Sequence, residues 1–372
     1  MATKSNAALA SVSSSDDALR YLDGDGNLLN ENHNVDDERL VALYRQMLRT
    51  RAFDEAAMRL QRIGRIPAYY PCAGQETHVA VASALEDRDW IFSQYREQGV
   101  RLARGVPVLN ELGLWRGMPH AFWDPAEYRI TPMNVTIGTH LPQATGYGYG
   151  AKLLGKDEIS LALFGDGATS EVDFHAALNF AGVWKTPTVF FCQNNRYAQS
   201  TPIEQQTASE TLAQKANASG IEGVRVDGMD IIAVLTALEA AVAKARNGGG
   251  PTMIESLCYR YTPHSTYDGT PVYRTREEEA EWKEKDPIVR TRAYLLRRSL
   301  IDEELDETLT VEMRADVDAA IDELEAMPLP PRDQSFRAVH HKMPPRLIEQ
   351  LHEEQQAAGE SLSDIPDEER CL

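Results

Sequence analysis

Two short polar motifs stand at the ends of consecutive apolar segments, where they could bind a ligand together. The tripeptide Gly165-Asp166-Gly167 follows the apolar run 159–164, and Asn194-Asn195 follows the apolar run 188–192. The residues between them fit one helix, over 171–184, which predicts a strand–helix–strand unit. Carboxyl ends of parallel strands meet at one edge of an open sheet, where ligands bind. We therefore expect both motifs at that edge.

The residue types suit a diphosphate held by Mg²⁺, which prefers oxygen ligands in near-octahedral geometry. Asp166 offers a carboxylate, Asn195 an amide oxygen, and a backbone carbonyl just beyond, such as that of Tyr197, a third ligand. Gly165 and Gly167 would allow the backbone to approach phosphates closely. Either motif alone is more often an ordinary turn, but the pair at two strand ends favours a binding site.

The same residues resemble the alpha subunits of the thiamine-diphosphate-dependent decarboxylating component of 2-oxoacid dehydrogenase complexes. The glycine–aspartate and double-asparagine motifs match the thiamine diphosphate motif of that family. Residues 92–97 (FSQYRE) are similar to its cofactor-anchoring segment, and residues 259–265 (YRYTPHS) to its mobile loop. The resemblance extends over about residues 20 to 355.

By position, the resemblance implies a set of cofactor-binding residues. The diphosphate is contacted by Tyr95 and Arg96, and Mg²⁺ is held by Asp166, Asn195 and the Tyr197 carbonyl. The aminopyrimidine is lined by Val135 and Ile137, and the backbone of Gly167 and Ala168 touches the cofactor. His264 lies over the cofactor and assists acyl transfer to lipoyl.

The chain departs from the family pattern at two places. Thr262 and Pro263 stand where relatives often carry a second histidine before the loop's His-Ser pair. The residue types at 134–140 differ from those of a potassium site in relatives, so no potassium is expected. Ser265 matches a position that is phosphorylated in some relatives, and an ordinary loop serine is the alternative.

The resemblance also implies the reaction and the partners. Thiamine diphosphate and Mg²⁺ are the cofactors, and the reaction is oxidative decarboxylation of a 2-oxoacid with reductive acylation of the lipoyl group on the acyltransferase component. In this family a glutamate beside the pyrimidine comes from the beta subunit. A heterotetramer of two alpha and two beta subunits is therefore expected.

Within the family, branched-chain 2-oxoacids are favoured, as in 3-methyl-2-oxobutanoate dehydrogenase. Residues 23–29 look like the N-terminal hairpin of branched-chain members, and residues 336–344 resemble their C-terminal extension. Pyruvate or acetoin dehydrogenase is the alternative. Two other classes were weighed: a non-catalytic assembly subunit, and a dinucleotide-binding protein. Gly146-Tyr147-Gly148-Tyr149-Gly150 has the wrong spacing for a dinucleotide site and suits a tightly packed helix.

Strands alternating with helices predict an α/β fold, a doubly wound parallel sheet with helices on both faces, as in the thiamine-diphosphate-binding fold. The pattern predicts helices over 36–61, 75–85 and, after an Asp230 cap, 231–246, with further strands over 224–226 and 252–258. A flexible N-terminal extension (1–35) and a C-terminal extension (331–372) flank the domain (36–330). We expect the loop 262–276 to be mobile without cofactor and ordered with it.

Composition excludes several classes. The 372 residues carry 57 acidic and 38 basic side chains, a net charge of −19, which does not suit binding to nucleic acid or to a membrane surface. None of the four cysteines (Cys72, Cys192, Cys258, Cys371) forms a CxxC pair, so a reducing, cytoplasmic location is expected. No apolar stretch approaches the ~20 residues that span a bilayer.

Overall fold

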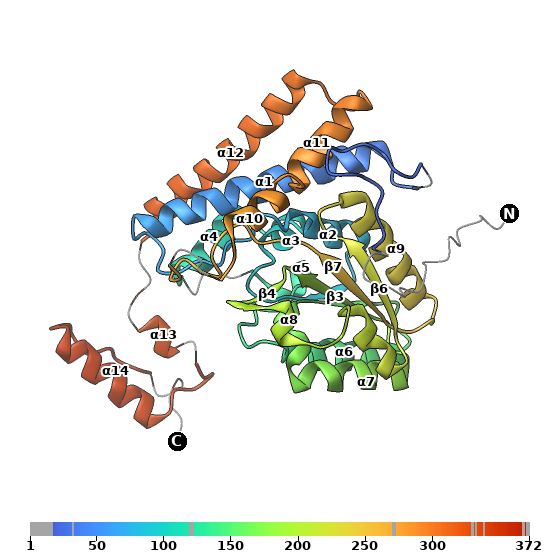
Figure 1. Cartoon of the computed structure of the whole chain (residues 1–372). Helices are drawn as coiled ribbons and strands as arrows, with labels where there is room; N and C mark the ends of the chain where they lie inside the picture. Colours follow the sequence, from blue (N-terminus) through green and yellow to red (C-terminus); the bar gives the residue numbers. More distant parts are fainter. Residues whose placement is uncertain are drawn as a thin grey trace.

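The computed structural model describes residues 18–31, 33–118, 123–269, 273–328, 331, 333–337, 339–366 and 369. Its centre is a five-stranded sheet in the order β1-β2-β3-β7-β6, in which every neighbouring pair is parallel. The expected doubly wound α/β fold is thus confirmed (Figure 1). The strands are β1 (Trp90–Phe92), β2 (Ser160–Gly165), β3 (Thr188–Asn194), β6 (Glu222–Asp227) and β7 (Thr252–Leu257).

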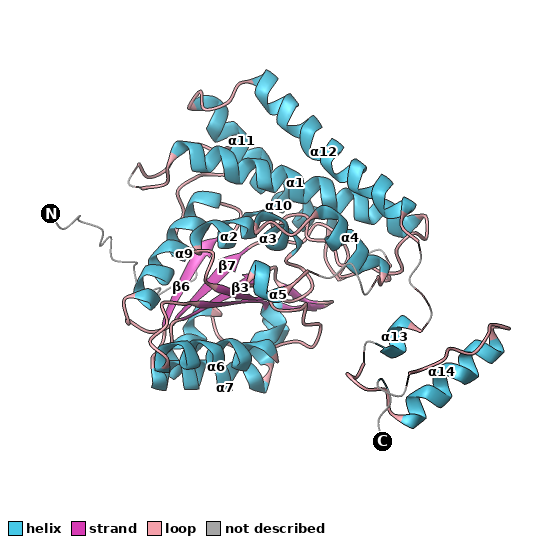
Figure 2. Ribbon diagram, turned by 180° about the vertical axis from the view of Figure 1, so that it is seen from behind, coloured by secondary structure: helices cyan, strands magenta, loops and turns pink. Residues whose placement is uncertain are grey.

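Helices cover both faces of this sheet, as Figures 1 and 2 show. Side chains alternate along each strand, so Leu161 and Leu163 of β2 join one core while Ala162 and Phe164 join the other. Burial on both faces explains why the strands are nearly continuous apolar runs. One face is covered by α2 (Ala80–Ala84) and α9 (Ile231–Arg246), the other by α6 (His140–Leu153), α7 (Val172–Trp184) and the 3₁₀ helix η4 (Ala213–Ser219).

A further layer of helices lies over the α2 and α9 side of the sheet (Figure 1). The long helix α1 (Asp37–Arg62) carries Phe53 and Leu60 into a third core with Trp115 of α4 and Leu324 of α12. The other helices are α3 (Gln98–Ala103), α4 (Val108–Arg116), α5 (Pro125–Tyr128), α8 (Ile203–Gln206), α10 (Arg276–Lys283), α11 (Pro287–Arg297), α12 (Glu303–Ala326), α13 (Gln334–Arg337) and α14 (Pro345–Ala357).

Two expected elements differ from the structure. The helix expected over 75–85 begins as a 3₁₀ turn, η1 (Glu76–Val79), in which the His78 N–H donates to the Gln75 carbonyl at 3.1 Å. The strand β1 was not expected, because only three residues separate the charged turn at 86–89 from the polar segment that follows. This short strand matters because it leads directly into residues 93–97.

The N-terminal segment is more ordered than expected where the structure describes it. Leu19 pairs with Val226 beside β6, and Leu22, which is fully buried, faces Leu28 across a tight turn. Asp23 Oδ1 accepts from the backbone N–H groups of Asp25 and Asn27. Residues 18–31 therefore belong to the packed domain, and residues 1–17 lie outside the described part of the chain.

The C-terminal segment has a small core of its own. Met343, Leu351 and Ile365 are buried together. Helices α13 and α14 lie apart from the other helices (Figure 2). Gly146–Gly150 lie in helix α6, as expected, and of these glycines only Gly148 is tightly packed, against Ser160 and Thr188. Cys72, Cys192 and Cys258 are buried and free, and Cys371 is outside the described residues. No helix within the described ranges is long and apolar enough to cross a membrane.

Candidate functional site

A cavity of about 180 Å³ lies at the carboxyl edge of β2 and β3, where the two polar motifs were expected to meet. Strand pairing in parallel brings Gly165 level with Gln193, so the residues that follow both strands converge. The cavity wall contains most of the residues selected from the sequence. It is lined by Gln75, Gln94, Tyr95, Arg96, Glu97, Ile137, Gly165, Asp166, Gly167, Ala168, Gln193, Asn195, Tyr197, Ala198, Gln199 and His264.

Asp166 is the acidic residue of this cavity that follows directly after β2. It opens the 3₁₀ helix η3 (Asp166–Ser170) directly after β2, and it is only 1% exposed. Burial raises the pKa of its carboxyl to about 6, although a 2.7 Å hydrogen bond donated by Gln206 Nε2 opposes the rise. A buried carboxylate is costly to ionise unless a cation lies beside it. The environment of Asp166 therefore fits a bound dication.

Asn195 supplies the second candidate ligand from the end of β3. Its Nδ2 donates to Gln75 Oε1 at 3.1 Å, and its Oδ1 accepts from the Tyr197 N–H at 3.2 Å. The Oδ1 atom keeps a second lone pair for a metal. No group of three or more His, Cys, Asp or Glu side chains in the described ranges could hold a metal ion. The candidate donors are instead one carboxylate, one amide oxygen and one backbone carbonyl. Such a set suits Mg²⁺ if phosphate oxygens and water fill the remaining positions.

The backbone at Gly167 packs too closely for a side chain. A Cβ atom there would lie 2.9 Å from the Ala198 Cβ, and Ala198 belongs to β4 (Tyr197–Ala198), which pairs with β5 (Thr201–Pro202). Ala168, the next residue, is 1% exposed. The turn after β2 is therefore packed closely against the segment after β3.

Arg96 and His264 form a contact at the side of the cavity. Arg96 Nη2 lies 3.2 Å from His264 Nδ1 and 3.0 Å from the His264 carbonyl oxygen, while Nη1 donates to the Pro71 carbonyl. A guanidinium group can only donate, so Nδ1 accepts and the ring proton lies on Nε2. Burial, assisted by Arg96 and Arg260, lowers the pKa of His264 to about 3. His264 is therefore neutral, with Nε2 as a donor.

Tyr95 packs beside this pair. Its ring centroid lies 4.5 Å from that of Tyr70 and 6.0 Å from that of His264, and the Arg96 guanidinium lies 5.5 Å from its centre. Burial raises the pKa of the Tyr95 hydroxyl, which stays protonated near neutral pH. The anchoring segment thus lines the cavity with Tyr95 and Arg96, beside Gln94 and Glu97.

One predicted residue lies elsewhere. Val135 has its side chain 53% exposed and does not line the cavity, whereas Ile137, 41% exposed, does. Within 134–140, Asn134 Nδ2 donates to Thr139 Oγ1 at 2.7 Å, and His140 Nε2 bonds to the Leu163 carbonyl at 2.7 Å. These polar groups therefore bond to one another or to the sheet.

Sequence reasoning did not select several amides and one acid of the cavity wall. Gln94, Glu97 and Gln193 adjoin selected residues, so their position in the motifs was an available signal. Gln75 and Gln206 come from segments without a chemical motif, and only the fold brings them to the site.

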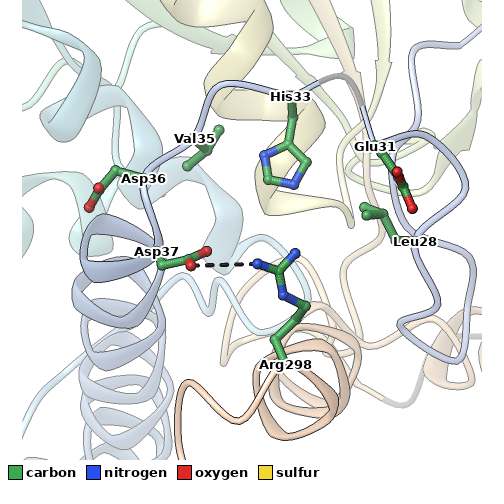
Figure 3. Close-up of a pocket in the computed structure, with 7 residues that line it drawn as sticks. All are labelled: Leu28, Glu31, His33, Val35, Asp36, Asp37 and Arg298. Atoms are coloured by element: carbon green, nitrogen blue, oxygen red, sulfur yellow. Dashed lines mark ion pairs between the residues drawn. The ribbon is translucent and has the colours of Figure 1, made fainter.

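A second, larger cavity of about 530 Å³ lies between the N-terminal turn and the end of α11 (Figure 3). Arg298 points toward Asp37, with Nη2 3.5 Å from the carboxylate, and both side chains are nearly half exposed. His33 Nε2 lies 3.3 Å from the Tyr294 hydroxyl. This wall holds an ordinary surface ion pair and no residue from the chemical motifs. The chemistry is therefore assigned to the smaller cavity.

Comparison with known proteins adds independent findings. The dehydrogenase E1 component family matches residues 44–332. The chain is 44% identical, over 74% of its length and 75% of the relative's, to the alpha subunit of 3-methyl-2-oxobutanoate dehydrogenase from Mycobacterium tuberculosis. It is 39% identical to the pyruvate dehydrogenase E1 component subunit alpha of Bacillus cereus, over 90% of this chain and 91% of the relative. The same subunit of Bacillus subtilis is 38% identical to the chain, over 94% of this chain and 98% of the relative.

Proposed function

The chain belongs to the dehydrogenase E1 component family, and on that premise we propose that it is the alpha subunit of a branched-chain 2-oxoacid dehydrogenase. The reaction is oxidative decarboxylation of the 2-oxoacid with reductive acylation of a lipoyl group. The observation that carries this proposal is the convergence of Asp166, Asn195, Arg96 and His264 on one cavity.

In this proposal the chain's residues hold the cofactor and the metal. Asp166, Asn195 and the Tyr197 carbonyl bind Mg²⁺, while Tyr95 and Arg96 bind the diphosphate. Thiamine diphosphate, when bound, supplies the electron sink for decarboxylation. Arg96 is well suited to a diphosphate because its guanidinium is permanently charged and presents several donors.

His264 holds a proton at a defined atom. Because Nδ1 faces Arg96, Nε2 carries the hydrogen and is the ring atom that can donate it. The lowered pKa keeps the ring neutral, so the bonding pattern does not change through the physiological pH range. This arrangement supports a role for His264 in acyl transfer to lipoyl.

The site needs a second subunit. The described part of this chain forms one parallel sheet with one pair of cofactor motifs. The resemblance to the family implies that the glutamate beside the pyrimidine ring comes from the beta subunit. A heterotetramer of two alpha and two beta subunits follows, with the lipoyl-bearing acyltransferase component as the further partner. Co-expression with the beta subunit tests this: the two chains should purify together and decarboxylate a 2-oxoacid with a dye acceptor.

The substrate proposal is 3-methyl-2-oxobutanoate. It is supported by the Mycobacterium tuberculosis relative, while pyruvate is the second candidate because the Bacillus relatives align over a larger share of this chain. The ratio of kcat/KM for the two oxoacids, measured on the alpha–beta complex, discriminates them. A value for pyruvate above that for 3-methyl-2-oxobutanoate would replace the first substrate with the second.

A further inference from the structure

A directed chain of buried side-chain amides runs from Asn195 to a buried acid. Asn195 Nδ2 donates to Gln75 Oε1 at 3.1 Å, Gln75 Nε2 donates to Gln193 Oε1 at 3.0 Å, and Gln193 Nε2 donates to Glu97 Oε1 at 3.0 Å. Each of the four side chains is at most 6% exposed. We call this series the amide relay. It extends along the wall of the cavity described above.

The acid fixes the direction of the relay. At the pH 8 of the test below, the Glu97 carboxyl is mostly ionised, and an ionised carboxylate accepts hydrogen bonds and donates none. Gln193 must then turn its NH₂ group toward Glu97 and its carbonyl toward Gln75. Gln75 must then turn its NH₂ toward Gln193 and its own carbonyl toward Asn195. An inverted amide at any link would place two acceptors in contact inside the protein, which costs the full desolvation of the unpaired groups.

The direction that Glu97 sets also places a carbonyl opposite His78, which assigns the tautomer of that ring. His78 Nδ1 lies 3.0 Å from Gln193 Oε1, and His78 is 1% exposed. Burial lowers the pKa of His78 to about 4, so the ring is neutral and its proton lies on Nδ1, facing a carbonyl. Two donors therefore converge on Gln193 Oε1, which leaves Gln193 Nε2 for Glu97.

The relay and the Tyr197 N–H together fix which atom of Asn195 faces the metal site. With Nδ2 committed to Gln75, Oδ1 is the atom left to accept from Tyr197 and to face the metal site. Glu97 and Gln75 both occupy helix N-cap positions, of α3 and η1, yet neither side chain caps its helix. Both side chains take part in the relay instead.

We propose that Glu97 is a positioning residue, which acts through Gln193 and Gln75 to hold the Asn195 amide with its oxygen toward the bound metal. This inference rests on the proposed function, since it takes Asn195 as a metal ligand. Substitution of a residue that orients a metal ligand through hydrogen bonds commonly lowers metal affinity by about 10- to 100-fold. Glu97 itself does not contact the metal ligands through any hydrogen bond within the described residues.

The test uses the alpha–beta complex, thiamine diphosphate and Mn²⁺ in place of Mg²⁺ at pH 8. Free Mn²⁺ is counted from its electron paramagnetic resonance signal, which reports metal affinity without requiring turnover. Glu97→Leu removes the terminal acceptor and should weaken Mn²⁺ binding by about 10-fold or more. Glu97→Gln keeps an acceptor oxygen for Gln193 and should stay within about 3-fold of the unchanged protein.

Matched controls separate positioning from loss of packing. Gln98, the neighbouring buried residue, donates to the Tyr70 carbonyl and is not part of the relay, so Gln98→Leu should leave Mn²⁺ affinity unchanged. Gln75→Leu breaks the relay at its other end and should reproduce the loss, which keeps the test valid if Glu97→Leu does not fold. Equal Mn²⁺ affinity in the relay variants and the unchanged protein overturns the inference, as does an equal loss in Gln98→Leu.

Asp166→Ala separates this inference from the proposed function. Loss of Mn²⁺ binding in Asp166→Ala together with full binding in Glu97→Leu and Gln75→Leu would reject the relay alone. Full binding in Asp166→Ala would reject the metal site, and the proposed function with it.

Discussion

Substitution of Glu97 by glutamine should make the protein more stable at alkaline pH and leave its stability unchanged at acid pH. Burial raises the pKa of the Glu97 carboxyl from its ordinary value of 4.5 to about 7, although Arg101 and Arg96 lower it in part. The folded protein therefore binds this proton more tightly than the unfolded chain. The contribution of this raised pKa to the free energy of unfolding is fully present below pH 4.5 and is lost as the pH rises through 7.

The size of the effect follows from the pKa difference. A change of about 2.5 pKa units at about 1.4 kcal/mol per unit gives about 3 kcal/mol in the free energy of unfolding. Glutamine does not ionise, so Glu97→Gln avoids this penalty while it keeps the hydrogen bond from Gln193. The stability difference between the two proteins should be near zero at pH 4.5, grow through pH 7 and then stay constant.

Thermal and urea unfolding of the alpha–beta complex over this pH range measures the difference. Gln98→Leu is the control, because it changes a neighbouring buried side chain that has no charge to titrate. A Glu97→Gln difference that stays constant with pH, or that declines as pH rises, would refute the assignment of a raised pKa to Glu97.

Three further predictions concern packing, chemistry and the loop. Gly99→Ala should destabilise the protein by about 1–3 kcal/mol, because the new Cβ would lie 2.3 Å from His78 Nε2 and 2.6 Å from Thr50 Oγ1. Urea unfolding measures this difference, and unchanged stability would contradict the prediction. His264→Ala should keep cofactor binding and dye-linked decarboxylation but slow lipoyl acylation by about 100-fold, and equal losses in both assays would argue against a role in acyl transfer. Limited proteolysis of the 262–276 loop should slow when thiamine diphosphate and Mg²⁺ are added, and equal cleavage would reject ordering by the cofactor.

The sequence predicted those parts of the fold that local patterns determine. The apolar runs before Asp166 and Asn194 became β2 and β3, because buried parallel strands are apolar on both faces. Asp230 was expected to cap a helix, and its carboxylate accepts from the backbone N–H groups of Ile232 and Ala233. Such features depend on neighbours in the chain and are visible without a structure.

The missed features depend on contacts between distant segments. Strand β1 is three residues long, too short to show a period, and it exists because it pairs with β2. Gln75 reaches Asn195 across 120 positions of the chain, and Gln206 reaches Asp166 across 40. A lone glutamine carries no chemical motif, so only tertiary packing could assign these amides to the site.

The most direct test of the proposed site is a crystal structure of the alpha–beta complex with thiamine diphosphate and Mn²⁺, using the anomalous scattering of manganese. The site predicts one peak at about 2.1 Å from oxygen atoms of Asp166, Asn195 and the Tyr197 carbonyl, with the diphosphate beside it. A manganese peak elsewhere, with these three oxygens facing only protein or water, would contradict it.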